Sequence, residues 1–182
     1  MNPDLDKLQA YPFEKLRALF AEVAPVAGKS AISLAMGEPR HAPPPFVLDV
    51  LANSLARLSS YPATAGSDTL RTTIADWLTR RFKLEGVDAS RQVLPLTGTR
   101  EGLFAIAQAC VDRSVRGATV ACPNPFYQIY EGAALLAGAE PYFANATPAS
   151  HYLADYDSVP EDVWQRCQML YICTPGNPSG AV

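Results

Sequence analysis

A short polar turn, Thr97-Gly98-Thr99-Arg100, has the residue types of an anion-binding site. It follows the apolar run Val93 to Leu96 and precedes a segment with apolar residues at helical spacing, which predicts a strand, a glycine turn and a helix start. The first backbone N–H groups of a helix are free to bind an anion, and the helix dipole favours negative charge there by about 0.3–1 kcal/mol. Gly98 allows close backbone approach and Thr99 adds a hydroxyl. We therefore expect a phosphate site here, with an ordinary capped turn as the alternative.

Two further polar turns also follow apolar, strand-like runs. Residues 123–127 come after the run 118–122, and residues 174–180 come after the run 169–173. From residue 92 onward, strand and helix patterns alternate, which predicts a largely parallel sheet with helices on its faces. Ligands of such sheets bind beyond the carboxyl ends of the strands. The three turns therefore predict one binding site.

The remaining elements are predicted from apolar spacing and from capping residues. Pro12 suits the start of a helix over residues 13–24, and Ser158 with Glu161 forms a possible capping box for a short helix. Further helices are expected from about Pro43–Pro45 through Leu58, from Ser67 or Asp68 to Phe82, and from Gln128 to Ala137, with extended runs over 32–36 and 140–143.

Composition excludes several classes of protein. The chain has 182 residues, 48% of them apolar and 18% charged, with a net charge of −3, so nucleic acid is an unexpected partner. The apolar runs are too short for a membrane span and the N-terminus does not resemble a signal peptide, so we expect a cytoplasmic protein. Two histidines and four cysteines without a C-x-x-C pair give no support for a metal site.

Short motifs along the whole chain together resemble those of fold-type-I pyridoxal-phosphate aminotransferases, the aspartate aminotransferase superfamily. In order, the motifs are Gly37-Glu38-Pro39, Tyr61 with Gly66 and Leu70-Arg71, Gly98-Thr99-Arg100-Glu101, Asn124-Pro125-Phe126-Tyr127 and Asn177-Pro178-Ser179-Gly180. The resemblance implies a three-layer α/β/α fold with a mostly parallel sheet. It assigns residues 1–45 to an N-terminal arm and part of a small domain, and residues 46–182 to part of the cofactor-binding major domain.

The same resemblance assigns roles in binding pyridoxal 5′-phosphate. Gly98, Thr99 and Arg100 are expected to bind its phosphate. Tyr127 is expected to stack on the pyridine ring, where an offset aromatic pair contributes about 0.5–1.5 kcal/mol beyond its buried area. Asn177 is expected to donate to the phenolic oxygen of the ring.

Substrate and subunit contacts follow from the resemblance as well. Gly37 is expected to present its backbone to the substrate carboxylate, and Tyr61 to reach the phosphate bound by a neighbouring subunit, which implies a homodimer. The Schiff-base lysine of the family follows the Asn-Pro-x-Gly turn, so it is expected beyond Val182 and no catalytic residue is expected within this chain. The four lysines all precede the phosphate turn: Lys7, Lys15, Lys29 and Lys83.

A finer similarity concerns the amino donor. The opening of the chain, residues 61–66 and residues 122–143 are similar to bacterial succinyldiaminopimelate aminotransferases. This implies amino transfer between N-succinyl-LL-2,6-diaminopimelate and 2-oxoglutarate or glutamate. The alternatives are another aminotransferase (aspartate or aromatic), a C–S lyase of the same fold, or a non-catalytic ligand-sensing lobe. A dinucleotide-binding domain would need G-x-G-x-x-G, which the turn at Gly98 does not supply.

Overall fold

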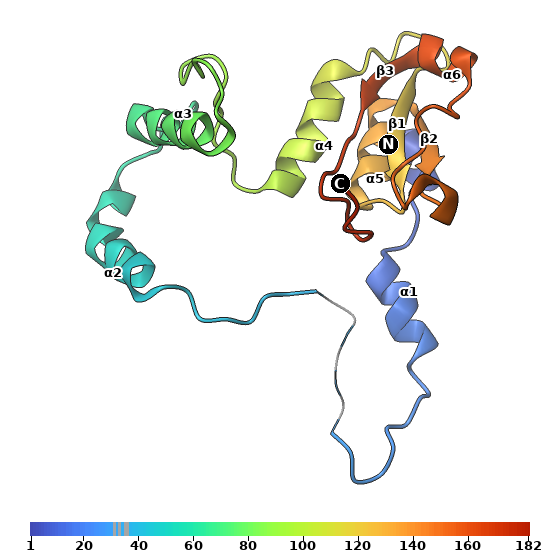
Figure 1. The fold of residues 1–182 in the computed structure, drawn as a ribbon, viewed down its shortest axis with the longest axis horizontal. Coiled ribbons are helices and arrows are strands. Elements are labelled where there is room, and N and C mark those ends of the chain that lie inside the picture. Colours follow the sequence, from blue (N-terminus) through green and yellow to red (C-terminus); the bar gives the residue numbers. More distant parts are fainter. Residues whose placement is uncertain (31, 33, 35–36) are drawn as a thin grey trace. The chain divides into compact units, whose positions relative to one another are not determined.

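The computed structural model describes residues 1–30, 32, 34 and 37–182 and divides the chain into two units (Figure 1). The first unit combines Met1–Tyr11 with Leu96–Val182, and the second spans Pro12–Pro95. Most of the extended run expected over residues 32–36 lies outside the described residues.

A three-stranded parallel sheet forms the centre of the first unit. Its order is β2-β1-β3, with β1 at Thr119–Asn124, β2 at Glu140–Asn145 and β3 at Cys167–Leu170. Every residue of β1 pairs with β2, from Thr119 opposite Glu140 to Asn124 opposite Asn145. The parallel sheet predicted from the alternating pattern is confirmed, and the carboxyl ends of β1 and β2 lie side by side.

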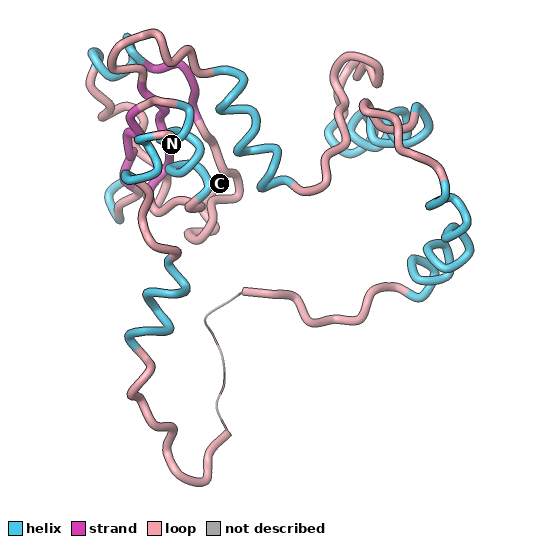
Figure 2. Tube along the Cα trace, turned by 180° about the vertical axis from the view of Figure 1, so that it is seen from behind, coloured by secondary structure: helices cyan, strands magenta, loops and turns pink. Residues whose placement is uncertain are grey.

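Helices cover both faces of this sheet, as the tube view in Figure 2 also shows. Helices α4 (Thr99–Cys110) and α5 (Ile129–Ala137) pack with Val120 and Cys122 in one buried cluster. The short helix α6 (Glu161–Arg166) packs with Ala144 of β2 in a second cluster. Because successive strand residues point to opposite faces, Phe143 joins the first cluster and Ala144 the second. The predicted three-layer α/β/α fold is thereby confirmed.

The N-terminal segment of the first unit is held by charge. Its 3₁₀ helix η1 (Pro3–Lys7) contains Asp4, which is 8% exposed and forms ion pairs with Lys7 at 2.8 Å and with Arg113 at 3.3 Å. The hydrogen bond from Lys7 lowers the pKa of the Asp4 carboxyl. The Asp4–Arg113 pair therefore connects the start of the chain to the loop between α4 and β1.

In the first unit, the end of α5 is as predicted, whereas the start of α6 is not. Helix α5 ends at Gly138, whose φ of 89° is a left-handed conformation that favours glycine. The capping box predicted at Ser158 is wrong, because Pro160 precedes α6 and the Ser158 hydroxyl donates to the carbonyl of Asp155 instead. A one-turn 3₁₀ helix, η3 (Pro148–Ser150), follows β2.

The second unit contains helices and turns. They are α1 (Pro12–Leu19), α2 (Pro45–Ser54), the 3₁₀ helix η2 (Leu55–Ser59) and α3 (Asp68–Phe82). The start of α3 is as predicted, since the Ser67 hydroxyl accepts from the Leu70 N–H at 3.2 Å. Helix α1 ends earlier than the predicted residue 24.

The strand predicted over Val93–Leu96 is wrong. These residues have no strand structure, although the helix that follows begins at Thr99 as predicted. A strand requires backbone partners, which local apolar character alone does not provide. No helix in the described part of the chain is long and apolar enough to cross a membrane.

Candidate functional site

The first turn of α4 provides backbone donors for an anion. Gly98 is the residue before the helix and Thr99 is its first residue; no side chain of the described residues caps this end. The first N–H groups therefore lack side-chain acceptors, which is the requirement for an anion site at a helix start. A β-carbon built on Gly98 would collide with the Glu101 carboxylate, the far end of a flexible and exposed side chain, so a side chain at position 98 would require Glu101 to move.

Charges at this turn are exposed and nearly balanced. The Arg100 guanidinium lies 3.4 Å from the Glu101 carboxylate, with 59% and 54% of the two side chains exposed. Exposed ion pairs contribute little, about 0–1 kcal/mol. Both side chains can therefore rearrange at small cost when an anion approaches the backbone donors.

Tyr127 lies in the connection between β1 and α5. Its ring meets that of Tyr130 edge-on, with centroids 6.1 Å apart and planes at 85°. The preceding ring, Phe126, stacks on Phe143 of β2 at 4.7 Å, which fixes this connection against the sheet. Tyr127 itself is half-buried, so part of its ring remains available to a ligand.

Asn177 lines a cavity of about 260 Å³ at the carboxyl ends of β1 and β3. Pro123, near the end of β1, and Pro125, in the turn that follows, line the same cavity, together with Tyr156 and Thr174. Beside it, the Asn124 amide donates to the Asn145 side chain at 2.7 Å and connects the ends of β1 and β2. The structure thus brings together two of the three predicted turns at this cavity.

The remaining predicted turn, Thr97–Arg100, does not line the cavity and is held in place by α4 instead. Neither Gly98–Arg100 nor Tyr127 is among the lining residues of the cavity. Instead, the Tyr171 hydroxyl donates to the carbonyl of Leu103 in α4 at 2.6 Å. The start of α4 is therefore fixed to the segment after β3, one helical turn from Thr99.

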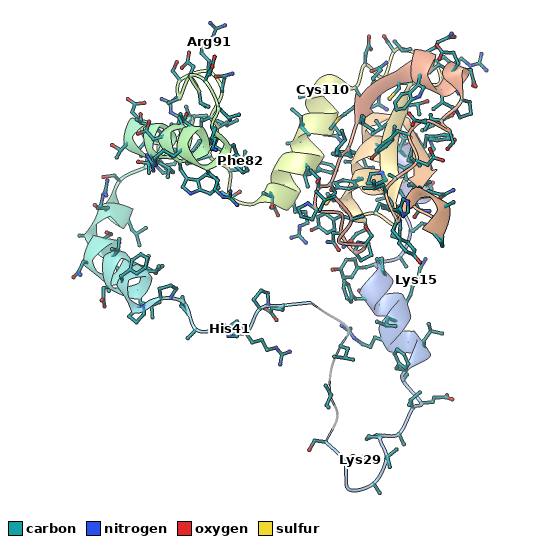
Figure 3. All side chains as sticks on the ribbon, in the orientation of Figure 1. Lys15, Lys29, His41, Phe82, Arg91 and Cys110 are labelled. Carbon is teal, nitrogen blue, oxygen red and sulfur yellow. The ribbon has the colours of Figure 1, made fainter. Side chains whose placement is uncertain are left out.

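Two predicted site residues belong to the second unit. Tyr61 is 97% exposed, and nothing lies within 4 Å of a β-carbon built on Gly37. Of the lysines, Lys7 in the first unit pairs with Asp4, whereas Lys15 and Lys29, labelled in Figure 3, lie in the second unit with Lys83.

Tyr130 and Tyr171 lie in segments predicted only as a helix and an apolar strand, yet Tyr130 contacts Tyr127, and Tyr171 contacts Tyr130 and α4. Their rings stack with centroids 4.3 Å apart, and burial raises the pKa of Tyr171 to about 12. Burial likewise raises the pKa of the Cys122 thiol to about 12. A hydroxyl at the end of an otherwise apolar ring is the one sequence signal that could have indicated Tyr171, since a buried phenol requires a hydrogen-bond partner.

This chain is similar to known aminotransferases in sequence. Residues 29–182 match the family described as aminotransferase class I and II. The LL-diaminopimelate aminotransferase of Moorella thermoacetica is 34% identical over 178 residues, which cover 97% of this chain and 44% of that protein. The enzyme of the same name from Desulforudis audaxviator is 32% identical over 177 residues, covering 96% and 44%.

Solved structures agree with these matches. An aminotransferase from Neisseria meningitidis Z2491 has a TM-score of 0.93 and 42% identity, covering 100% of this chain and 46% of that one. Aminotransferase AspB from Helicobacter pylori 26695 has a TM-score of 0.84 and 35% identity, covering 95% and 44%. The chain spans somewhat less than half the length of each of these relatives.

Proposed function

The chain belongs to the class I and II aminotransferases, whose cofactor is pyridoxal 5′-phosphate, and we propose on this premise that Leu96–Val182 supplies part of the cofactor site. The observation that carries the proposal is the start of α4. There, uncapped backbone donors coincide with a glycine, whose lack of a β-carbon leaves the N–H groups open to close approach. These features match the needs of a phosphate group, because the oxygens can approach the N–H groups closely and a negative charge is favoured at the helix start.

Each predicted side chain has a proposed task toward the cofactor. The N–H groups of Thr99 and Arg100, with the Thr99 hydroxyl, bind the phosphate; Tyr127 stacks on the ring and restricts its tilt; Asn177 donates to the phenolic oxygen. When bound, the cofactor serves as an electron sink for the reacting carbon, while the protein supplies orientation and electrostatics. The half-buried Tyr127 ring and the position of Asn177 at the strand-end cavity support these assignments.

The proposed reaction is amino transfer from a diaminopimelate-type donor to 2-oxoglutarate. The two candidate amino donors are LL-diaminopimelate and its N-succinyl derivative. Relatives at 32% and 34% identity are LL-diaminopimelate aminotransferases, which favours the free diamino acid. The stretch-wide similarity noted above favours the N-succinyl derivative. In both cases a cytoplasmic biosynthetic role is proposed.

The two donors can be compared directly. The whole protein is assayed for glutamate formation from 2-oxoglutarate with LL-diaminopimelate and with N-succinyl-LL-diaminopimelate as donors. The donor with the higher kcat/KM by tenfold or more identifies the specificity, since a tenfold ratio corresponds to about 1.4 kcal/mol of transition-state binding. Aspartate and an aromatic amino acid complete the panel, and a preference for either of them would refute the diaminopimelate proposal.

We further propose that the active protein is a homodimer in which Tyr61 contacts the phosphate bound by the partner subunit, and that the Gly37 backbone binds the substrate carboxylate. Support comes from the near-complete exposure of Tyr61, a large amphipathic side chain that has no packing role in its own unit. Dimer formation is measured by sedimentation in the presence and absence of the cofactor.

Cofactor binding is tested on the 182-residue chain itself. The chain is titrated with pyridoxal 5′-phosphate and, as a matched control, with pyridoxal, which lacks the phosphate. We expect the phosphorylated form to bind at least tenfold more tightly, because the phosphate accepts charge-assisted hydrogen bonds at the start of α4. Equal affinity for the two forms would contradict the assignment of Gly98–Arg100.

A further inference from the structure

A continuous path of aromatic rings leads from the proposed ring-binding residue to the proposed phosphate-binding helix. Tyr127 contacts Tyr130 edge-on at 6.1 Å, and Tyr130 stacks on Tyr171 at 4.3 Å with an interplanar angle of 17°. The Tyr171 hydroxyl then donates to the Leu103 carbonyl at 2.6 Å. We propose that Tyr130 and Tyr171 are positioning residues that hold the Tyr127 ring in a fixed relation to the first turn of α4.

Each link in this path is anchored in the core. Tyr130 is 6% exposed and Tyr171 is 4% exposed, and both belong to the first buried cluster. The Tyr171 N–H also donates to the Ala121 carbonyl of β1 at 2.9 Å. Tyr171 is therefore bonded to the central strand through its backbone and to α4 through its side chain, so it sets the distance between them.

The chemistry of the path explains why tyrosine is needed at its end. A stacked pair of rings fixes the tilt of both, because offset stacking is favoured over other arrangements. A buried hydroxyl donating to a carbonyl is stronger in this low-dielectric setting than in water, and its loss leaves the ring free to slide along the helix. Phenylalanine at position 171 would keep the stack but lose the connection to Leu103.

This proposal rests on the proposed function for the roles of Tyr127 and α4. It adds that Tyr130 and Tyr171 couple the position of the Tyr127 ring to that of α4. The coupling exists in the protein without cofactor, so it can be tested without it. Three variants of the 182-residue chain are compared with the unsubstituted chain: Tyr171→Phe, Tyr130→Leu and, as control, Tyr142→Phe. Tyr142 is a tyrosine of β2 that packs against the second cluster, whereas Tyr130 and Tyr171 belong to the first cluster.

The first measurement is the NMR signal of the Tyr127 ring in each variant without cofactor. We expect Tyr171→Phe to shift the Tyr127 ring resonances through Tyr130, and Tyr142→Phe to leave them unchanged. Unchanged Tyr127 resonances in a folded Tyr171→Phe chain would overturn the proposal. Tyr130→Leu provides a second check, because it removes the ring between them and should also shift the Tyr127 signal.

The second measurement is the circular dichroism that bound pyridoxal 5′-phosphate acquires from its surroundings, taken at saturation. Tyr171→Phe and Tyr130→Leu should alter the band per bound cofactor and weaken binding about threefold to tenfold, the effect of one hydrogen bond or one aromatic pair. A variant that loses only thermal stability, with an unaltered band, would count against positioning. The same band is measured with the whole protein, where absence of cofactor binding would contradict the proposed function, whereas the Tyr127 resonances still decide the coupling.

Discussion

Replacing Gly98 with alanine separates the proposed phosphate site from the stability of the fold. The added β-carbon would meet the Glu101 carboxylate in front of the first turn of α4. The backbone at Gly98 is extended, with φ at 172°, a conformation that any residue adopts without strain. The substitution therefore tests the effect of an added methyl group in front of α4, without a change in backbone conformation.

The magnitude follows from the surroundings of the new methyl group. Glu101 is 54% exposed and its partner Arg100 is 59% exposed, so the carboxylate can turn into solvent with a change in the free energy of unfolding of about 0.5 kcal/mol or less. A phosphate kept from close approach loses about one charge-assisted hydrogen bond, or about 1.5–3 kcal/mol. This corresponds to a roughly 10- to 150-fold weaker affinity for pyridoxal 5′-phosphate.

Calorimetric titration with the cofactor measures the affinity, and urea unfolding measures the stability. The matched control is Gly132→Ala in α5, where a β-carbon meets only a methyl group of Leu8 at 3.9 Å. That control should keep its affinity and gain up to about 1 kcal/mol of stability from the higher helix propensity of alanine. Wild-type affinity in a folded Gly98→Ala chain would refute the assignment of α4 as the phosphate site.

Three further predictions concern the core, the titrating thiol and the exposed tyrosine. Val120→Ala, at a fully buried position of the central strand, should lower the free energy of unfolding in urea by about 1.5–3 kcal/mol, because two methyl groups are lost and a cavity remains. A loss below about 0.5 kcal/mol would argue against the described core. The Cys122 thiol should resist alkylation in the folded chain, because burial raises its pKa from 9.0 to about 12. The stability that this thiol contributes should be complete below pH 9.0 and decline as the pH rises towards about 12, and Cys122→Ala should reduce that decline. Tyr61→Phe should leave the unfolding of the chain unchanged because the side chain is 97% exposed, while weakening cofactor binding by the whole protein about threefold to tenfold; unchanged binding would argue against the proposed contact between subunits.

Local signals predicted those features that depend on neighbouring residues. Ser67 caps α3 and Gly138 ends α5 because each acts on a backbone group within a few positions. The parallel sheet was predictable since its connections alternate with helices. The same local reasoning failed at Ser158, where the hydroxyl had an equally near acceptor in Asp155.

Features that depend on pairing across the chain could not be predicted in this way. The apolar run at Val93–Leu96 has strand character, but strand structure requires a partner that the sequence alone does not identify. The stack of Tyr130 on Tyr171 depends on the register of β3 beside β1, which is irregular between Thr119 and Val120. For the candidate site, residue types indicated Gly98 and the family resemblance indicated Tyr127 and Asn177, whereas the contacts of Tyr130 and Tyr171 required coordinates.

The ion pair between Asp4 and Arg113 also bears on the order in which the chain assembles during synthesis. The two residues are 109 positions apart. At roughly 5–20 residues per second, about 5–20 s separate their emergence from a ribosome. Contacts among the elements after Leu96 span fewer positions, such as 68 from Leu103 to Tyr171, whereas the first eleven residues must wait for these elements to emerge. The N-terminal segment is therefore expected to dock after β1 to β3 have associated, at the cost of closing a loop that already contains the entire second unit.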